Sequence, residues 1–162
     1  MNESLTARIR DRLGVNWLTP SQKKVWEQVQ RFDGPLHRVI NVYGFAGTGK
    51  TFLGWLMERL NYATYSTWTQ PSKPLLPRLV LDDMVPDRSR TRNLRSLVDQ
   101  YHIQQLILLS RNRVDELAMP AFEVRITEDD MDVFRANLYR HLDIVVPEVD
   151  VMNYQAVLDK LV

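Results

Sequence analysis

The sequence contains no cysteine, no long apolar run and almost no excess of either charge. Without cysteine the chain has neither a disulfide framework nor a thiolate metal site, and the composition suits a reducing cytosol. No apolar run approaches the length of a membrane span, and residues 1–4 lack the apolar core of a signal peptide. We therefore expect a cytoplasmic protein that does not use a membrane.

The formal net charge of +1 gives no general argument for a polyanionic partner, so any nucleic-acid surface has to be a local patch. A chain of 162 residues, 44% of them hydrophobic, is long enough for one good core and too short for two. We expect a single globular domain.

The most informative stretch lies between an apolar run, residues 39–43, and a helical pattern that begins at Lys50. It reads G-x-x-x-x-G-K-T and consists of Gly44, Phe45, Ala46, Gly47, Thr48, Gly49, Lys50 and Thr51. Glycines let successive backbone N–H groups turn toward phosphates, and the helix N-terminus adds its positive end. Lys50 would bring a charge to the transferred phosphate, and the Thr51 hydroxyl would bind Mg²⁺. The alternative, a glycine-rich turn that binds nothing, is disfavoured because every motif position is filled.

A second candidate site follows the apolar run Leu79-Val80-Leu81, which ends in Asp82 and Asp83. Ligands of open α/β sheets bind at the carboxyl ends of the strands. We therefore expect Asp82 to hold Mg²⁺ through water, as in a Walker B strand, and Asp83 to polarise the attacking water. For Asp83 the alternative is a loop acid that only turns the chain.

Three further polar features are open to more than one interpretation. Ser110, with Asn112 as second choice, ends the apolar strand 104–109 and could sense the γ-phosphate or only cap the strand. Gln22 stands three residues after Thr19 and is placed to complete a helix capping box.

An arginine cluster after the paired acids could bind a nucleic-acid backbone, a small phosphorylated substrate or an acidic partner, or could be a solvated helix start. Its members are Arg88, Arg90, Arg92 and Arg95.

Hydrophobic periodicity predicts an α/β protein. The expected helices are 4–13, 20–32, 50–60, a helical stripe within 87–101, 127–142 and 154–161. The expected strands are 38–43, 63–67, 79–83, 104–109 and 122–126. Pro71, Pro74 and Pro77 exclude a helix between the second and third strands. Either the second strand is displaced or this connection is a tight extended loop.

The order of phosphate loop, acid-ended strand and polar strand end resembles the AAA+ branch of P-loop ATPases. Residues 79–83 and 106–110 are most similar to replication initiators and helicase loaders of the DnaA and DnaC kind, and the loop 44–51 is also similar to motif I of superfamily 1 helicases. The resemblance implies a three-layer α-β-α sandwich with a mostly parallel five-stranded sheet in the order 5-1-4-3-2. It implies N-terminal helices in residues 1–35, the ATPase core in 36–127 and a helical extension in 128–162.

The resemblance also bears on ligands. In many helicase-like ATPases a glutamine placed as Gln22 is hydrogen-bonded to adenine, which implies an adenine contact here. The stretch 113–121 is too short for the usual helix that presents an arginine finger, and Arg113 is a poor substitute, so the resemblance does not extend to assembly-driven hydrolysis. The chain looks like a reduced ATPase core.

Three function classes remain. The first is Mg²⁺-dependent ATP binding and hydrolysis, with a protein partner, in DNA replication, mobility or defence. The second is a kinase for a small molecule or nucleotide, with the arginine cluster as substrate clamp, although the paired acids disfavour it. The third is a nucleotide-bound interaction module without catalysis. The guanine-reading motif Asn-Lys-x-Asp does not occur in the sequence, which favours ATP over GTP.

Overall fold

A computed structural model describes residues 4–32, 37–70, 72–85, 94–114, 119–148, 150 and 152–161. The helices are α1 (Leu5–Arg12), α2 (Pro20–Arg31), α3 (Lys50–Arg59), α5 (Leu94–Gln100), α6 (Glu128–Leu142) and α7 (Tyr154–Asp159), with a short 3₁₀ turn at Val15–Trp17. The strands are β1 (Val39–Tyr43), β2 (Thr64–Thr67), β3 (Arg78–Met84), β4 (Gln105–Ser110) and β5 (Ala121–Glu123).

The five strands form one parallel sheet in the order β2-β3-β4-β1-β5. This is the expected order 5-1-4-3-2 counted from the opposite edge, so that prediction is confirmed, and the mostly parallel sheet proves to be entirely parallel. The central strands are near-continuous apolar runs because both faces of the sheet are covered. All six residues of β4 are buried.

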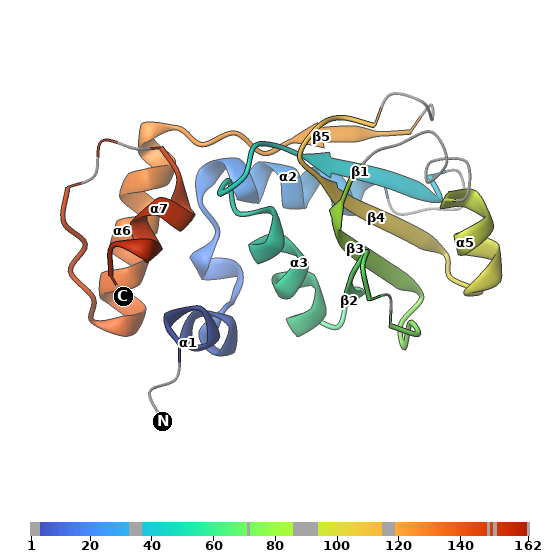
Figure 1. Cartoon of the computed structure of the whole chain (residues 1–162), viewed down its shortest axis with the longest axis horizontal. Coiled ribbons are helices and arrows are strands. Elements are labelled where there is room, and N and C mark those ends of the chain that lie inside the picture. Colours follow the sequence, from blue (N-terminus) through green and yellow to red (C-terminus); the bar gives the residue numbers. More distant parts are fainter. Residues whose placement is uncertain are drawn as a thin grey trace.

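Two hydrophobic clusters cover the two faces and confirm the three-layer arrangement (Figure 1). On one face, Ile40, Val42 and Ile107 pack with α2 and α3. On the other, Leu79, Leu106 and neighbouring side chains pack with α5. Side chains alternate between faces with the period of two that strand geometry requires.

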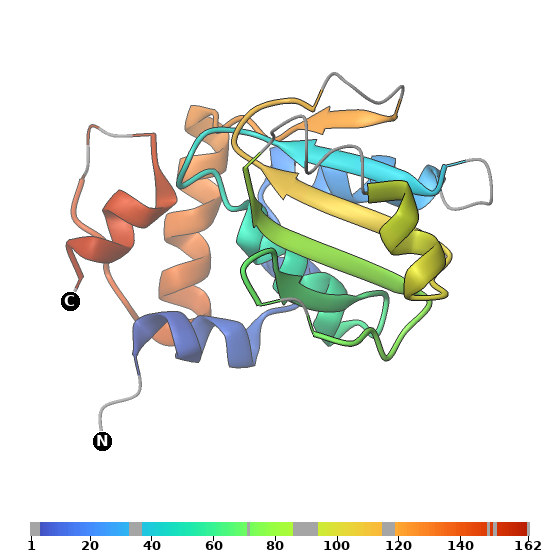
Figure 2. The same ribbon diagram turned by 45° about the vertical axis from the view of Figure 1, so that its right-hand side comes forward.

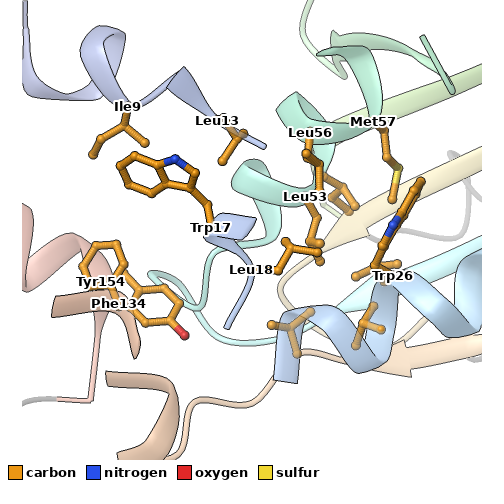
Figure 3. Packing of buried hydrophobic residues seen from close by; sticks show 14 of the residues in the cluster. Ile9, Leu13, Trp17, Leu18, Trp26, Leu53, Leu56, Met57, Phe134 and Tyr154 are labelled. Atoms are coloured by element: carbon orange, nitrogen blue, oxygen red, sulfur yellow. The ribbon is translucent and has the colours of Figure 1, made fainter. Parts of the chain in front are cut away.

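A further group of helices, α1, α6 and α7, lies beyond the carboxyl ends of the strands (Figures 1 and 2). Trp17 is 1% exposed and lies beside Ile9 of α1 (Figure 3). Its ring stacks on that of His141 in α6, with centroids 4.6 Å apart. Arg8 and Arg12 donate hydrogen bonds to the carbonyls of Leu142 and His141, the unpaired end of α6. The loop that connects β1 to α3 lies beside this group of helices (Figures 1 and 2).

The connection between β2 and β3 is the tight extended loop, the second of the two alternatives. β2 pairs directly with β3, and within residues 68–70 and 72–77 the chain forms no helix. The hydroxyl of Thr64 accepts hydrogen bonds from the backbone N–H groups of Leu75 and Leu76. In a crossover helix such N–H groups would pair within the helix; here a side chain of β2 satisfies two of them.

The last strand is shorter than predicted. β5 ends at Glu123, whereas the expected strand reached Ile126. The Val124 N–H still donates to the Tyr43 carbonyl, but β1 ends there and the chain turns into the loop that begins at Gly44. In the described part of the chain no strand continues beside β5 beyond this point, so the alternating pattern of residues 125–126 is not used for pairing.

The start of α6 is fixed by a buried carboxylate. Asp130 is fully buried and accepts hydrogen bonds from the backbone N–H and hydroxyl of Ser21 and from those of Thr127. Burial alone would raise the pKa of Asp130, but these hydrogen bonds outweigh it and leave the pKa below its usual value.

Replacing Asp130 by asparagine is expected to lower the free energy of unfolding at pH 7 by about 2 kcal/mol, because a neutral amide cannot accept all four bonds. A carboxylate whose pKa is lowered on folding contributes its full stabilisation above its ordinary pKa of about 4. This stabilisation is lost as the pH falls toward the lowered pKa of the folded state. Urea unfolding at pH 7 and pH 3 should show the difference between wild type and variant shrinking at the lower pH. An equal difference at both values would rule out this role, and the exposed Asp129→Asn is the control.

Among the described residues, no helix combines the length and the apolar character that crossing a membrane requires. The domain boundaries at 35 and 127 and the cytoplasmic location stay predictions.

Candidate functional site

The loop 44–49 connects the carboxyl end of β1 to the N-terminus of α3. Gly47 and Gly49 have φ angles of 79° and 85°, in the left-handed region that side chains disfavour. A Cβ on Gly44 would lie 2.4 Å from the carbonyl oxygen of Val124. The motif glycines are therefore required by the backbone itself, and the loop has the strand-to-helix context that the sequence predicted.

Lys50, the first residue of α3, folds back over the loop. Its ammonium donates hydrogen bonds to the carbonyls of Gly44 at 2.7 Å and Phe45 at 2.9 Å. Burial lowers the pKa of Lys50; Asp82 and Asp83 oppose this effect, and Arg111 adds to it. A partly desolvated ammonium beside a loop of backbone N–H groups is a strong point charge for an anion.

Thr51 and Asp82 are brought into direct contact. The Thr51 hydroxyl donates to Asp82 Oδ2 at 2.7 Å, and the Tyr65 hydroxyl donates to the same oxygen at 2.8 Å. The backbone N–H of Asp83 donates to the other oxygen, Oδ1, at 2.8 Å. Asp82 is only 3% exposed, so the carboxylate is held in one orientation at the carboxyl end of β3.

This pair fits a magnesium ion. Mg²⁺ prefers hard oxygen ligands and is commonly held by one or two carboxylates together with substrate phosphates and water. Thr51 and Asp82 place a hydroxyl and a carboxylate oxygen side by side at the phosphate loop. Burial and the charge of Asp82 raise the pKa of the Tyr65 hydroxyl, which keeps this phenol protonated as a donor that orients the carboxylate.

Asp83 adopts an unusual backbone conformation, with φ at 58°. The pairing register of β3 with β4 shifts between Leu81 and Met84, so the chain bulges at this point. The bulge turns Asp83 out of the sheet, where its side chain is exposed while that of Asp82 is buried. Bulges of this kind often re-aim a side chain beside a functional site.

A cleft of about 460 Å³ joins these groups. It is lined by residues from the ends of β3 and β4 and from the loop, including Ala46, Lys50, Asp82, Asp83, Ser110 and Arg111. Five of the residues predicted for phosphate and metal chemistry, Ala46, Lys50, Asp82, Asp83 and Ser110, thus surround one space. Arg111 was missed by sequence reasoning, although its place directly after Ser110 at a strand end was a usable signal.

Ser110 lies at this edge with its hydroxyl engaged. It is 2% exposed, donates to the carbonyl of Asn112 at 2.7 Å and accepts from the side-chain amide of Asn41 at 2.8 Å. Asn41 also accepts from the backbone N–H of Val114. These bonds shape the chain that follows β4, and the phosphate-sensing role of Ser110 stays a prediction.

Gln22 forms the predicted capping box at the start of α2. Its side-chain oxygen accepts from the Thr19 N–H at 3.1 Å, and its Nε2 donates to the Gly49 carbonyl at 3.4 Å. The capping interpretation is therefore confirmed, and the same side chain also contacts the phosphate loop. The adenine contact implied by the resemblance stays a prediction.

A second, smaller cavity of about 200 Å³ lies on the other side of the loop. Its lining comes from α1, the loop, α3 and α7, and includes Ile9, Gly49, Phe52, Trp55, Tyr154 and Gln155. The contribution of α7 was missed by sequence reasoning, because nothing in a short terminal helix reveals which distant loop it will contact. The predicted arginine contacts lie outside the described part of the chain: residues 86–93, with Arg88, Arg90 and Arg92, and the side chain of Arg95.

No protein-family model matches this sequence, and no curated protein matches it either. Solved structures do match. One is described as a DNA replication initiation factor, with a TM-score of 0.58 and 16% identity. Another is AMPPCP-bound DnaA from Aquifex aeolicus, with a TM-score of 0.56 and 15% identity. Each comparison covers 86% of this chain and 58% of the other.

This chain shares the fold of these two structures, one of which is a DnaA. The fold implied by the sequence resemblance is thereby confirmed. The chain spans little more than half the length of these two proteins. Its sequence identity to each of them is low, so the similarity describes the fold alone.

Proposed function

We propose that this chain binds ATP with Mg²⁺ and hydrolyses it, working with a partner in DNA replication or a related DNA process. The observation that carries the proposal is the 2.7 Å contact between Thr51 and Asp82 beside the phosphate loop. A metal ion bound to phosphates requires a carboxylate ligand beside the loop. A glycine-rich turn that binds no ligand gives no reason for a carboxylate to be buried there.

The phosphates would lie against the backbone N–H groups of the loop and the N-terminus of α3, where Lys50 adds its charge. Thr51 and Asp82 would hold Mg²⁺, which neutralises charge on the β- and γ-phosphates when bound. The cavity beside Phe52 and Trp55 is the space that we assign to the base and ribose, because it opens directly from Gly49 and Thr51. Aromatic walls suit a planar base.

Hydrolysis would rest on Asp83, which lines the cleft with Lys50 and Asp82. An exposed carboxylate one residue beyond the metal ligand can orient a water molecule toward the γ-phosphate. Arg111 lines the same cleft and carries the charge that would stabilise the transferred phosphoryl group. We propose both as the groups of this chain that act on the reacting atoms.

The biological role is inferred from the two similar structures, one a DNA replication initiation factor and the other a DnaA. We therefore propose that DNA, or a protein bound to it, is the partner that raises turnover. Arg88, Arg90, Arg92 and Arg95 remain the proposed DNA contacts.

Phosphate release from ATP should be measured for the full chain with Mg²⁺, alone and with single-stranded or double-stranded DNA. We expect slow turnover alone and at least a ~10-fold increase with one form of DNA, of the size expected when a partner completes a phosphoryl-transfer site. Turnover that neither form of DNA changes would contradict DNA itself as the stimulating partner and leave a DNA-bound protein as the partner to test, without bearing on the proposed ATP binding. Tight binding without any release would instead favour a nucleotide-bound interaction module.

A further inference from the structure

The phosphate loop is held from outside by the start of α7. Asn153 Nδ2 donates a hydrogen bond to the Ala46 carbonyl at 3.2 Å, and the Tyr154 N–H donates to the Gly47 carbonyl at 3.0 Å. Both views of the ribbon show the start of α7 beside the connection between β1 and α3 (Figures 1 and 2). Two consecutive carbonyls of the loop are thus fixed by residues more than a hundred positions further along the chain.

These bonds determine where the N–H groups of the loop point. In a planar trans peptide the carbonyl and the N–H of the following residue point in opposite directions. The Ala46 carbonyl shares its peptide with the Gly47 N–H, and the Gly47 carbonyl shares its peptide with the Thr48 N–H. Drawing both carbonyls toward α7 therefore turns both N–H groups away from α7 and into the concave side of the loop, where an anion would bind.

The contact is close and specific. A Cβ on Gly47 would lie 2.0 Å from Asn153 Oδ1. One on Gly49 would lie 2.2 Å from Gln22 Nε2 and 3.1 Å from the Tyr154 ring. The start of α7 thus occupies the space beside Gly47 and, behind Gln22, part of the space beside Gly49. A larger residue at Gly47 would displace Asn153 as well as strain the loop.

The start of α7 is itself firmly anchored. The ring of Tyr154 packs on Phe134 with centroids 4.5 Å apart (Figure 3). The Tyr154 hydroxyl donates to the Thr19 hydroxyl at 3.0 Å. Asn153 also caps α7, since its Oδ1 accepts from the Ala156 N–H at 3.0 Å. Gln22 completes the arrangement by donating to the carbonyl of Gly49. Three loop carbonyls are therefore held by one connected set of side chains and backbone groups.

We propose that Asn153 and Tyr154 are positioning residues that hold the phosphate-binding loop in its nucleotide-binding conformation. The proposal rests on the proposed function, because the ligand is the same triphosphate. It assigns the C-terminal segment a direct part in nucleotide affinity, which a helix that only covers the core would not have. A preorganised loop binds more tightly because less conformational freedom is lost on binding.

The first test replaces Asn153 by serine. Serine also caps helices through its hydroxyl, but its side chain is too short to reach the Ala46 carbonyl as asparagine does. α7 should stay formed while one loop carbonyl loses its donor. We expect the dissociation constant for ATP to rise about 2- to 10-fold, the effect of losing one ordinary hydrogen bond.

A matched pair tests the backbone contact. Tyr154→Ala and Tyr154→Pro both remove the ring, but only proline removes the N–H that bonds to the Gly47 carbonyl. Proline is well tolerated at the first position of a helix, and Asn153 already has the extended conformation that a following proline requires, with φ at −152° and ψ at 117°. We expect Tyr154→Pro to bind ATP about 2- to 10-fold more weakly than Tyr154→Ala.

Amide resonances recorded without nucleotide separate failure of this proposal from failure of the proposed function. In Asn153→Ser, the N–H signals of Gly47 and Thr48 should shift and exchange faster with solvent, while those of Val157 and Leu158 in α7 stay protected. Shifted loop signals together with weaker ATP binding support the proposal. Unshifted loop signals, or an unchanged ATP dissociation constant in a wild type that binds ATP, would overturn it. If the wild type binds no ATP, the proposed function fails, and the loop signals alone decide whether α7 holds the loop.

Discussion

Replacing Lys50 by alanine is expected to weaken ATP binding by about 30-fold or more while leaving the fold intact. Truncating one partner of a desolvated charge pair commonly costs about 2–5 kcal/mol, and each 1.4 kcal/mol is a tenfold change in affinity. The ammonium is bonded to two carbonyls of the loop itself, Gly44 and Phe45, so its loss removes no contact between distant elements. Isothermal titration with ATP and Mg²⁺ measures the change.

The control for this substitution is Lys23→Ala, which removes an exposed lysine from α2. It alters the net charge equally and should leave the ATP dissociation constant unchanged. Circular dichroism and the thermal midpoint establish that the Lys50 variant is folded. A folded Lys50→Ala protein with unaltered affinity for ATP would show that the loop does not hold the triphosphate.

Replacing Asp83 by asparagine is expected to reduce ATP turnover by about 10²- to 10⁴-fold, the usual contribution of a general base. Asparagine has the same shape, and it tolerates the left-handed backbone conformation that Asp83 adopts. The bulge at the end of β3 should therefore persist, and the orientation of Asp82 with it. ATP affinity should change little, since Asp83 is the exposed member of the pair and follows Asp82, which is the proposed metal ligand.

Turnover is measured at saturating ATP for wild type, Asp83→Asn and the exposed-acid control Asp129→Asn. Only the Asp83 variant should lose activity. Equal turnover in wild type and Asp83→Asn would mean that Asp83 only shapes the bulge and that another group orients the water. A parallel loss of affinity and turnover would instead indicate damage to the metal site.

The fold was predictable because its signals are local and periodic. The apolar runs of β1, β3 and β4 indicated strands buried on both faces, and the capping residues Thr19 and Thr127 marked the starts of α2 and α6. The end of β5 was not predictable in this way. Its sequence alternates to Ile126, but a strand extends only as far as its neighbour, and that limit is set by the loop after β1.

In the candidate site too, some residues were predictable from local sequence signals and others were not. Lys50, Thr51 and Asp82 follow from motif spacing, since the carboxyl ends of neighbouring parallel strands meet at one edge. Tyr65, Arg111, Asn153 and Tyr154 belong to no motif. Tyr65 reaches Asp82 because β2 is the neighbour of β3 in the sheet, and Asn153 reaches Ala46 because α6 and α7 fold back beyond the sheet. Such contacts are set by tertiary packing, which one sequence does not reveal.

A crystal structure of the full chain with a non-hydrolysable ATP analogue and Mg²⁺ tests most directly whether this loop and the carboxylate of β3 form a nucleotide site. We predict that the β-phosphate lies against the N–H groups of residues 47–51. We also predict that the metal lies between the phosphates, the Thr51 hydroxyl and the Asp82 carboxylate. A nucleotide bound elsewhere, or a loop without phosphate at saturating concentrations of the analogue, would contradict the proposed ATP-dependent function.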